Sequence, residues 1–238
     1  MTPLARLLAA LDHTRLGSGD TDEDIRHVCA DAAAGGARPA AVCVHPQFAG
    51  VARSALDVGG APEIAVAAVA NFPDGGSDAA RPLAEIALAL AAGAVEIDLV
   101  FPWRAWLAGD RRTAAGLLAA CRAASDGRTL KVILETGALG EPRVIRELAA
   151  FALDQGADFI KTSTGKTATG ATPAAARAIL EIVRDRGAGG LKVSGGIRTV
   201  ADAASYLDLA DAILGAGWAR PPTFRIGASS LLTALRAE

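Results

Sequence analysis

Residues 130–162 read LKVILETGALGEPRVIRELAAFALDQGADFIKT and contain two β-type runs separated by one helical stretch. Leu130–Glu135 and Phe159–Thr162 are short, mostly apolar runs bounded by turn signals, which is typical of buried strands. The stretch between them is amphipathic and rich in Ala and Leu, and Gly156 stands where its helix should end. A strand, a helix and a second strand in this order predict a parallel βαβ unit.

The same alternation continues in both directions along the chain. Six further β-type runs are expected at Leu11–His13, Ala41–Val44, Ile64–Ala70, Val95–Val100, Leu191–Ser194 and Phe224–Gly227. Eight strands alternating with helices, without a linker, predict an α/β protein: a single (β/α)8 TIM barrel over residues 1–238 with a short N-terminal helix. A doubly wound open sheet is the alternative, but the Gly-x-Gly-x-x-Gly fingerprint after a first strand is missing.

Helix start signals support this alternation. Thr21-Asp-Glu-Asp24 and Thr199-Val-Ala-Asp202 have the form of capping boxes. Thr172 is followed by Pro173, which is suited to the first turn of a helix. We therefore expect helices to begin after Thr21, Thr172 and Thr199.

Composition excludes several classes of function. The net charge is −2 and no basic run occurs, so neither nucleic acid nor an anionic membrane surface is an expected partner. The three cysteines are too few and too scattered for a disulfide framework or a zinc site, and reduced thiols indicate a cytoplasmic protein. The histidines lack metal-ligand spacing, so we expect no metal and no cofactor. The oligomeric state stays open, with a homodimer as one candidate.

Lysine is rare in this chain and concentrated in or just after the expected strands. Of the 24 basic residues, 20 are Arg and four are Lys: Lys131, Lys161, Lys166 and Lys192. Arginine replaces lysine wherever a solvated positive charge is enough, but it cannot lose its proton and attack a carbonyl. The placement of these lysines therefore suggests amine chemistry.

Polar residues gather where the expected strands end, and in a barrel these ends form the active site. Side chains alternate along a strand, so Glu96 and Asp98 share the inward face of one strand. Lys161 and Lys192 point inward from two neighbouring strands by the same rule. Two adjacent ammonium groups repel each other, and one of them relieves the repulsion by losing its proton, as a Schiff-base amine must. The alternative is that each lysine is a counter-ion of a carboxylate.

Glycines and hydroxyls follow the last three strands. Gly165-Lys166, Gly195-Gly196 and Gly227-Ala-Ser-Ser230 lie in the loops that form the usual phosphate site of this fold. Glycine lets backbone N–H groups approach an anion, Ser229 and Ser230 can donate hydroxyls, and either Lys166 or Arg198 can supply charge. The alternative is that these residues form tight turns and helix caps. Cys43 is expected either to line the pocket or to belong to the core.

The motifs together resemble deoxyribose-phosphate aldolase, a class I, Schiff-base aldolase family. The resemblance spans about residues 10–232. It rests on Leu11-Asp-His-Thr, Val42-Cys-Val-His-Pro46, Asn71-Phe-Pro, Glu96-Ile-Asp-Leu-Val-Phe-Pro102, Lys131-Val-Ile-Leu-Glu-Thr-Gly137, Phe159-Ile-Lys-Thr-Ser-Thr-Gly165, Lys192-Val-Ser-Gly-Gly-Ile-Arg198 and Arg225-Ile-Gly-Ala-Ser-Ser230.

This resemblance implies an enzyme that cleaves 2-deoxyribose 5-phosphate reversibly to glyceraldehyde 3-phosphate and acetaldehyde. It implies that Lys161 forms the Schiff base, that Lys192 is the second amine and that Asp98 is the acid/base carboxylate. The substrate contacts that it implies are Asp12, Cys43, Thr162, Gly165, Lys166, Gly195, Gly196, Gly227, Ser229 and Ser230.

One feature departs from the family pattern. Some members end in a tail that carries a Tyr, whereas the only Tyr of this chain is Tyr206, in an expected helix. Proton transfer assisted by such a tail is therefore not expected. Two other functions stay open: a Schiff-base aldolase for a different phosphorylated sugar, and a barrel that binds a sugar phosphate without catalysis.

Overall fold

The computed structural model describes residues 1–125 and 127–238, and its eight strands close into one barrel in sequence order. The strands are β1 Leu11–Thr14, β2 Ala41–Val44, β3 Ala65–Ala70, β4 Glu96–Val100, β5 Thr129–Ile133, β6 Phe159–Lys161, β7 Gly190–Ser194 and β8 Phe224–Ala228. All neighbouring strands are parallel, and β1 pairs with both β2 and β8. The (β/α)8 TIM barrel expected from the alternation is confirmed.

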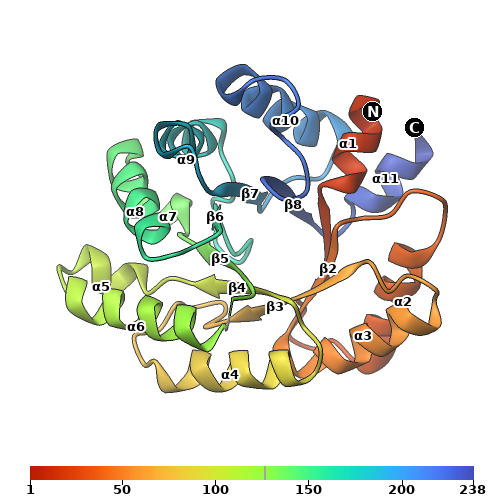
Figure 1. The fold of residues 1–238 in the computed structure, drawn as a ribbon, viewed down its shortest axis with the longest axis horizontal. Helices are drawn as coiled ribbons and strands as arrows, with labels where there is room; N and C mark the ends of the chain where they lie inside the picture. The colour runs from red at the N-terminus through yellow and green to blue at the C-terminus, as the bar shows by residue number, and fades with distance from the viewer. Residues whose placement is uncertain (126) are drawn as a thin grey trace.

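The helices surround the barrel (Figure 1). They are α1 Pro3–Ala9, α2 Asp22–Ala33, α3 Ala49–Val58, α4 Ala80–Ala91, α5 Trp103–Leu107, α6 Arg111–Ala124, α7 Thr136–Leu139, α8 Pro142–Asp154, α9 Pro173–Arg186, α10 Val200–Leu214 and α11 Leu231–Ala237, with a 3-10 turn at Pro46–Phe48. The expected short N-terminal helix is α1, which contacts the last helix, α11. No helix among the described residues is long and apolar enough to cross a membrane.

The three expected helix starts are confirmed. Thr21 and Thr199 each accept a hydrogen bond from the backbone N–H three residues later, and the aspartates at those positions bond back to the Thr backbone N–H. The Thr172 side chain accepts from the backbone N–H of Ala175 at the start of α9. These caps satisfy backbone donors that the first helical turn leaves unpaired.

Two of the expected strands end later than the observed ones. β5 ends at Ile133 rather than Glu135, whose φ of 56° lies in the left-handed region and turns the chain away from the sheet. β6 ends at Lys161 rather than Thr162. In both strands the chain turns where polar residues begin, which places those residues at the carboxyl end of the barrel.

The two faces of the barrel wall differ in kind. Outward side chains such as Ile97, Leu99 and Ile160 pack against the helices in one large apolar core. Inward side chains of β2 and β3 are small and apolar, including Ala41 and Ala67. Small residues on this side leave room for the long charged side chains that reach inward from β4 to β8.

Candidate active site

A single carboxylate receives three lysine amines inside the barrel. Asp98 is fully buried on β4. Its Oδ1 accepts from Lys131 Nζ at 2.8 Å, and its Oδ2 accepts from Lys161 Nζ and Lys192 Nζ, each at 2.7 Å. The structure thus brings together the three residues that the resemblance implies are catalytic, and it adds Lys131.

Strand register explains why these side chains meet. Asp98 lies beside Lys131 across β4 and β5, and Lys161 lies beside Lys192 across β6 and β7. Neighbouring residues in register share a face of a parallel sheet. Barrel curvature then directs both pairs toward the same axis.

A second group of charges lies against the first. Asp12 on β1 accepts from Lys192 Nζ at 2.5 Å and from Arg225 at 2.6 Å. Glu96 on β4 accepts from Arg225 at 2.7 Å and from Lys131 Nζ at 2.5 Å. The substrate contact implied for Asp12 is therefore joined to Lys192, while Glu96 and Arg225 extend the network.

Burial and charge lower the pKa of Lys161. Burial has the largest effect, because it disfavours the ammonium form, and the neighbouring Lys192 lowers the pKa further. Asp98 opposes both effects and does not outweigh them. A lowered pKa increases the fraction of free amine, the form that attacks a carbonyl.

The other two buried amines show the opposite shift. Burial alone would lower the pKa of Lys192, but Asp12 and Asp98 raise it above its usual value. Asp98 and Glu96 do the same for Lys131. Burial would raise the pKa values of Asp12 and Asp98, yet the surrounding cations hold both well below the usual range. Of the three amines, Lys161 is therefore the one whose proton is most easily lost.

Lys161 opens into a cavity of about 490 Å³ at the carboxyl end of the strands. The cavity contains most of the residues implied for phosphate binding. Its lining comprises Thr14, Arg15, Leu16, Gly17, Asp20, Lys161, Thr164, Gly165, Lys166, Ser194, Gly195, Gly196, Ile197, Arg198, Gly227, Ala228, Ser229 and Ser230. A sugar-sized ligand in this space would lie between a nucleophilic amine and a rim of glycines and hydroxyls.

The loops after β6 and β7 pack closely at this rim. Gly165, Gly195 and Gly196 have φ values of 75°, 90° and 84°, a region that favours glycine. A Cβ on Gly170 would lie 2.3 Å from the carbonyl oxygen of Gly195, so the two loops cannot accommodate a side chain there. The glycines therefore form tight turns and also leave the backbone exposed at the rim. The interpretation as tight turns and the interpretation as a phosphate site are thus compatible.

Residues at the end of β8 and residues just after it lie at different depths in the cavity. Ser229 and Ser230 are exposed at the cavity rim. Gly227 lies deeper, where a Cβ would stand 3.0 Å from Lys192 Cε and 3.0 Å from Ser194 Cβ. Gly227 therefore makes space for the Lys192 side chain as well as lining the cavity.

Thr162 and Cys43 lie in different surroundings. The Thr162 hydroxyl donates to the Ser194 carbonyl and accepts from the Ser194 backbone N–H, and Thr162 does not line the cavity. The structure therefore does not bring this expected contact to the cavity, because Thr162 follows Lys161 and faces the other way. Cys43 does point inward, with its Sγ 3.8 Å from Asp98 Oδ2, and burial raises its pKa.

Two buried residues near the site were given no role from the sequence. Glu135, buried after β5, accepts from the hydroxyls of Thr164 and Thr167 at 2.5 and 3.1 Å and so holds the loop after β6. Arg225 is buried on β8 beside Lys192. Side-chain alternation places Arg225 on the same face as Gly227, and an inward arginine would have been the signal.

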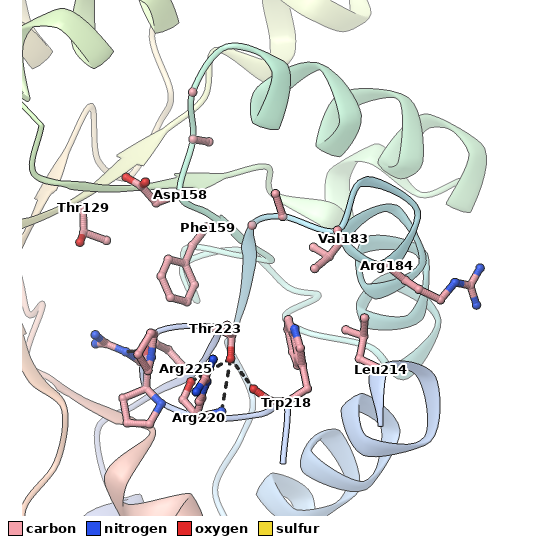
Figure 2. Close-up of a pocket in the computed structure, with 17 residues that line it drawn as sticks. Thr129, Asp158, Phe159, Val183, Arg184, Leu214, Trp218, Arg220, Thr223 and Arg225 are labelled. Carbon is pink, nitrogen blue, oxygen red and sulfur yellow. Dashed lines mark hydrogen bonds between the residues drawn. The ribbon is translucent and has the colours of Figure 1, made fainter. Parts of the chain in front are cut away.

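A second cavity, of about 940 Å³, lies at the amino ends of β5 to β8 (Figure 2). Phe159, Trp218 and Arg220 line it, and Arg225 forms part of its wall. Lys161 is absent from its lining. The smaller cavity at the carboxyl end is thus the candidate active site.

No group of three or more His, Cys, Asp or Glu side chains within residues 1–125 and 127–238 could hold a metal ion. The buried carboxylates instead have lysine and arginine as partners. Charge compensation in this site is supplied by the protein's own cations.

Comparison with known proteins agrees with this geometry. Residues 6–237 match the DeoC/LacD family aldolase. A Toxoplasma gondii protein, provisionally assigned as a deoxyribose-phosphate aldolase, is 31% identical with a TM-score of 0.88, covering 99% of this chain and 95% of its own. The deoxyribose phosphate aldolase of Aeropyrum pernix, described as tetrameric, is 26% identical with a TM-score of 0.81, covering 99% and 92%. The barrel, the buried amines and the match over nearly the whole length together place the chain in the DeoC/LacD aldolase family.

Proposed function

We propose that the protein is a class I aldolase that cleaves 2-deoxyribose 5-phosphate to glyceraldehyde 3-phosphate and acetaldehyde through a Schiff base on Lys161. The observation that carries the proposal is the lowered pKa of an amine that faces a sugar-sized cavity. The aldolase family match and the structural relatives named deoxyribose-phosphate aldolase support the choice of reaction and substrate.

The reaction begins at C1 of the open-chain aldehyde. The Lys161 amine attacks this carbon, and loss of water from the carbinolamine leaves a positively charged iminium. Asp98 Oδ2 accepts from both Lys192 Nζ and the reacting Lys161 Nζ, each at 2.7 Å. The pair of Asp98 and Lys192 is placed to supply and remove the protons that dehydration requires.

The hydroxyl group at C3 of the substrate then makes cleavage of the carbon chain possible. The C3 hydroxyl gives up its proton toward Asp98, and C3 becomes the aldehyde carbon of glyceraldehyde 3-phosphate. The C2–C3 bond breaks, and its electron pair forms the enamine that neutralises the iminium nitrogen. Protonation at C2 and hydrolysis release acetaldehyde, which contains C1 and C2, and regenerate the Lys161 amine. No redox step and no cofactor are needed.

The phosphate end of the substrate is assigned to the cavity rim. Gly165, Gly195 and Gly196 offer backbone N–H groups, Ser229 and Ser230 offer hydroxyls, and Lys166 lines the same cavity. Hydrogen bonds to a charged group are worth more than neutral ones, about 1.5–3 kcal/mol each. Such contacts would hold C1 near Lys161.

The experiment that tests the proposal measures cleavage of several phosphorylated sugars. Purified protein is incubated with 2-deoxyribose 5-phosphate, ribose 5-phosphate and fructose 1,6-bisphosphate, and both products are quantified. Equal amounts of acetaldehyde and glyceraldehyde 3-phosphate from the first substrate are expected. Faster cleavage of another sugar would indicate a different Schiff-base aldolase, and binding without cleavage of any of them would indicate a non-catalytic barrel.

A further inference from the structure

The buried charges around Lys161 form a closed ring in which cations and carboxylates alternate. Its six members, in order, are Asp12, Arg225, Glu96, Lys131, Asp98 and Lys192. Each of the three cations donates hydrogen bonds to two carboxylates, and each carboxylate accepts from two ring cations. Lys131 also lies 3.6 Å from Asp12, across the ring. We call these six residues the charge ring.

Lys161 stands outside this ring. Within the described residues it contacts one carboxylate, Asp98, through an oxygen that also accepts from Lys192. Three positive and three negative ring members already balance, so a protonated Lys161 would leave one uncompensated positive charge. Lys161 and the ring members are each at most 7% exposed, and an uncompensated charge at such burial is strongly disfavoured.

Arg225 is the ring member that fixes this balance. Its guanidinium donates to Asp12 Oδ1 at 2.6 Å and to both Glu96 oxygens, at 2.7 and 3.2 Å. Arginine retains its proton at any pH that a protein tolerates, and the surrounding carboxylates raise the pKa values of Lys131 and Lys192. The ring therefore keeps its three positive charges, of which that of Arg225 is independent of pH.

The protein holds Arg225 from the opposite end of the barrel. Its Nε donates to the Pro221 carbonyl at 2.6 Å, and its guanidinium lies 5.8 Å from the centre of the Phe159 ring. Figure 2 shows Arg225 in the wall of the second cavity, beside the segment that leads into β8. The Arg225 side chain is thus oriented by Pro221 and Phe159 on the side of the second cavity and by Asp12 and Glu96 on the side of the charge ring.

We infer that Arg225 is a positioning residue that closes the charge ring and thereby leaves Lys161, among the buried amines of the described residues, as the one whose single carboxylate partner is already bonded to two ring lysines. The inference rests on the proposed Schiff-base function and extends it to a residue that lines the far cavity rather than the substrate cavity. Arg225 acts through Asp12 and Glu96, and it touches no reacting atom.

The pH dependence of imine formation is the property that this arrangement controls. Asp98, Lys192 and Cys43 face Lys161 directly, and Arg15, Asp20, Lys166 and Arg198 line the same cavity. Removing the Arg225 charge leaves two ring cations for three carboxylates, so a protonated Lys161 becomes the missing third cation. Its pKa then rises, and less free amine is present at neutral pH.

The test follows the rate at which acetaldehyde and cyanoborohydride modify Lys161 as a function of pH. Arg225→Met is expected to move the midpoint of this profile upward by at least about one unit, a tenfold loss of trapping at pH 7.5. Arg6→Met, which removes an arginine paired with Asp211 away from the ring, is the matched control and should leave the midpoint in place. Thermal unfolding shows which variants are folded.

A compensating substitution separates charge from structural damage. Glu96→Gln combined with Arg225→Met removes one charge of each sign, so the double variant should recover a midpoint close to that of the unmodified protein. An unshifted midpoint in folded Arg225→Met, or a double variant that is as shifted as the single one, would overturn the inference. Failure to trap Lys161 in the unmodified protein would instead overturn the proposed function.

Discussion

Lys192 and Lys161 are chemically identical side chains in contact with the same carboxylate oxygen, yet they have opposite pKa shifts. The difference arises from Asp12, which bonds to Lys192 and raises its pKa. Lys161 has no equivalent second carboxylate among the described residues. The position of one aspartate therefore decides which amine remains protonated and which is the proposed nucleophile.

Substituting Lys192 with Met tests this division of roles. Lys192 lowers the pKa of Lys161, so removing its charge should raise that pKa and shift imine formation to more alkaline pH. A lysine with an ordinary pKa near 10.4 has about one free amine per thousand molecules at pH 7.5. Cleavage at neutral pH should fall strongly. An unchanged pH profile of trapping would mean that Lys192 does not activate Lys161.

Substituting Asp98 with Asn separates the two chemical steps. Loss of the carboxylate removes the group that is proposed to receive the C3 proton, and kcat should fall about 10²–10⁴-fold. It also removes the charge that favours the protonated form of Lys161, so trapping by acetaldehyde at pH 7.5 should remain within about tenfold of the normal rate. Single-turnover trapping and steady-state cleavage measure the two steps independently. A parallel loss in both would show that Asp98 serves mainly to orient Lys161.

The loops after β6, β7 and β8 form one rim because their glycines allow close approach, and this rim is the proposed phosphate site. Ser229→Asp places a negative charge at this rim. It should lower kcat/KM for 2-deoxyribose 5-phosphate by about tenfold to hundredfold. Cleavage of unphosphorylated 2-deoxyribose should change little. Equal losses on the two substrates would indicate that Ser229 has only a structural role.

At the level of elements, side-chain alternation predicted most of the site. It places Asp98, Lys161 and Lys192 inward, and the observed strand registers agree. Thr162 was expected at the substrate from its motif, although alternation turns it away from Lys161. The ends of β5 and β6 were harder to predict, since Glu135 adopts a left-handed conformation and its carboxylate accepts hydrogen bonds from Thr164 and Thr167, about 30 residues further along the chain.

At the scale of the whole barrel, closure creates contacts that no local pattern contains. Asp12 and Arg225 lie 213 residues apart in sequence, and the pairing of β1 with β8 makes them hydrogen-bond partners. The sequence shows that each residue lies on an inward face but not which opposite charge it meets. The charge ring was therefore out of reach of sequence reasoning, whereas its individual lysines were not.

The most direct test of the account is to locate the covalent intermediate. The intact protein is treated with acetaldehyde and borohydride, with and without EDTA, and peptide mass spectrometry then identifies the modified residue. We expect a two-carbon adduct on Lys161, in equal yield with and without the chelator, and none in Lys161→Arg, because a guanidinium does not form the imine. An adduct confined to another lysine, or activity that EDTA abolishes, would contradict the account.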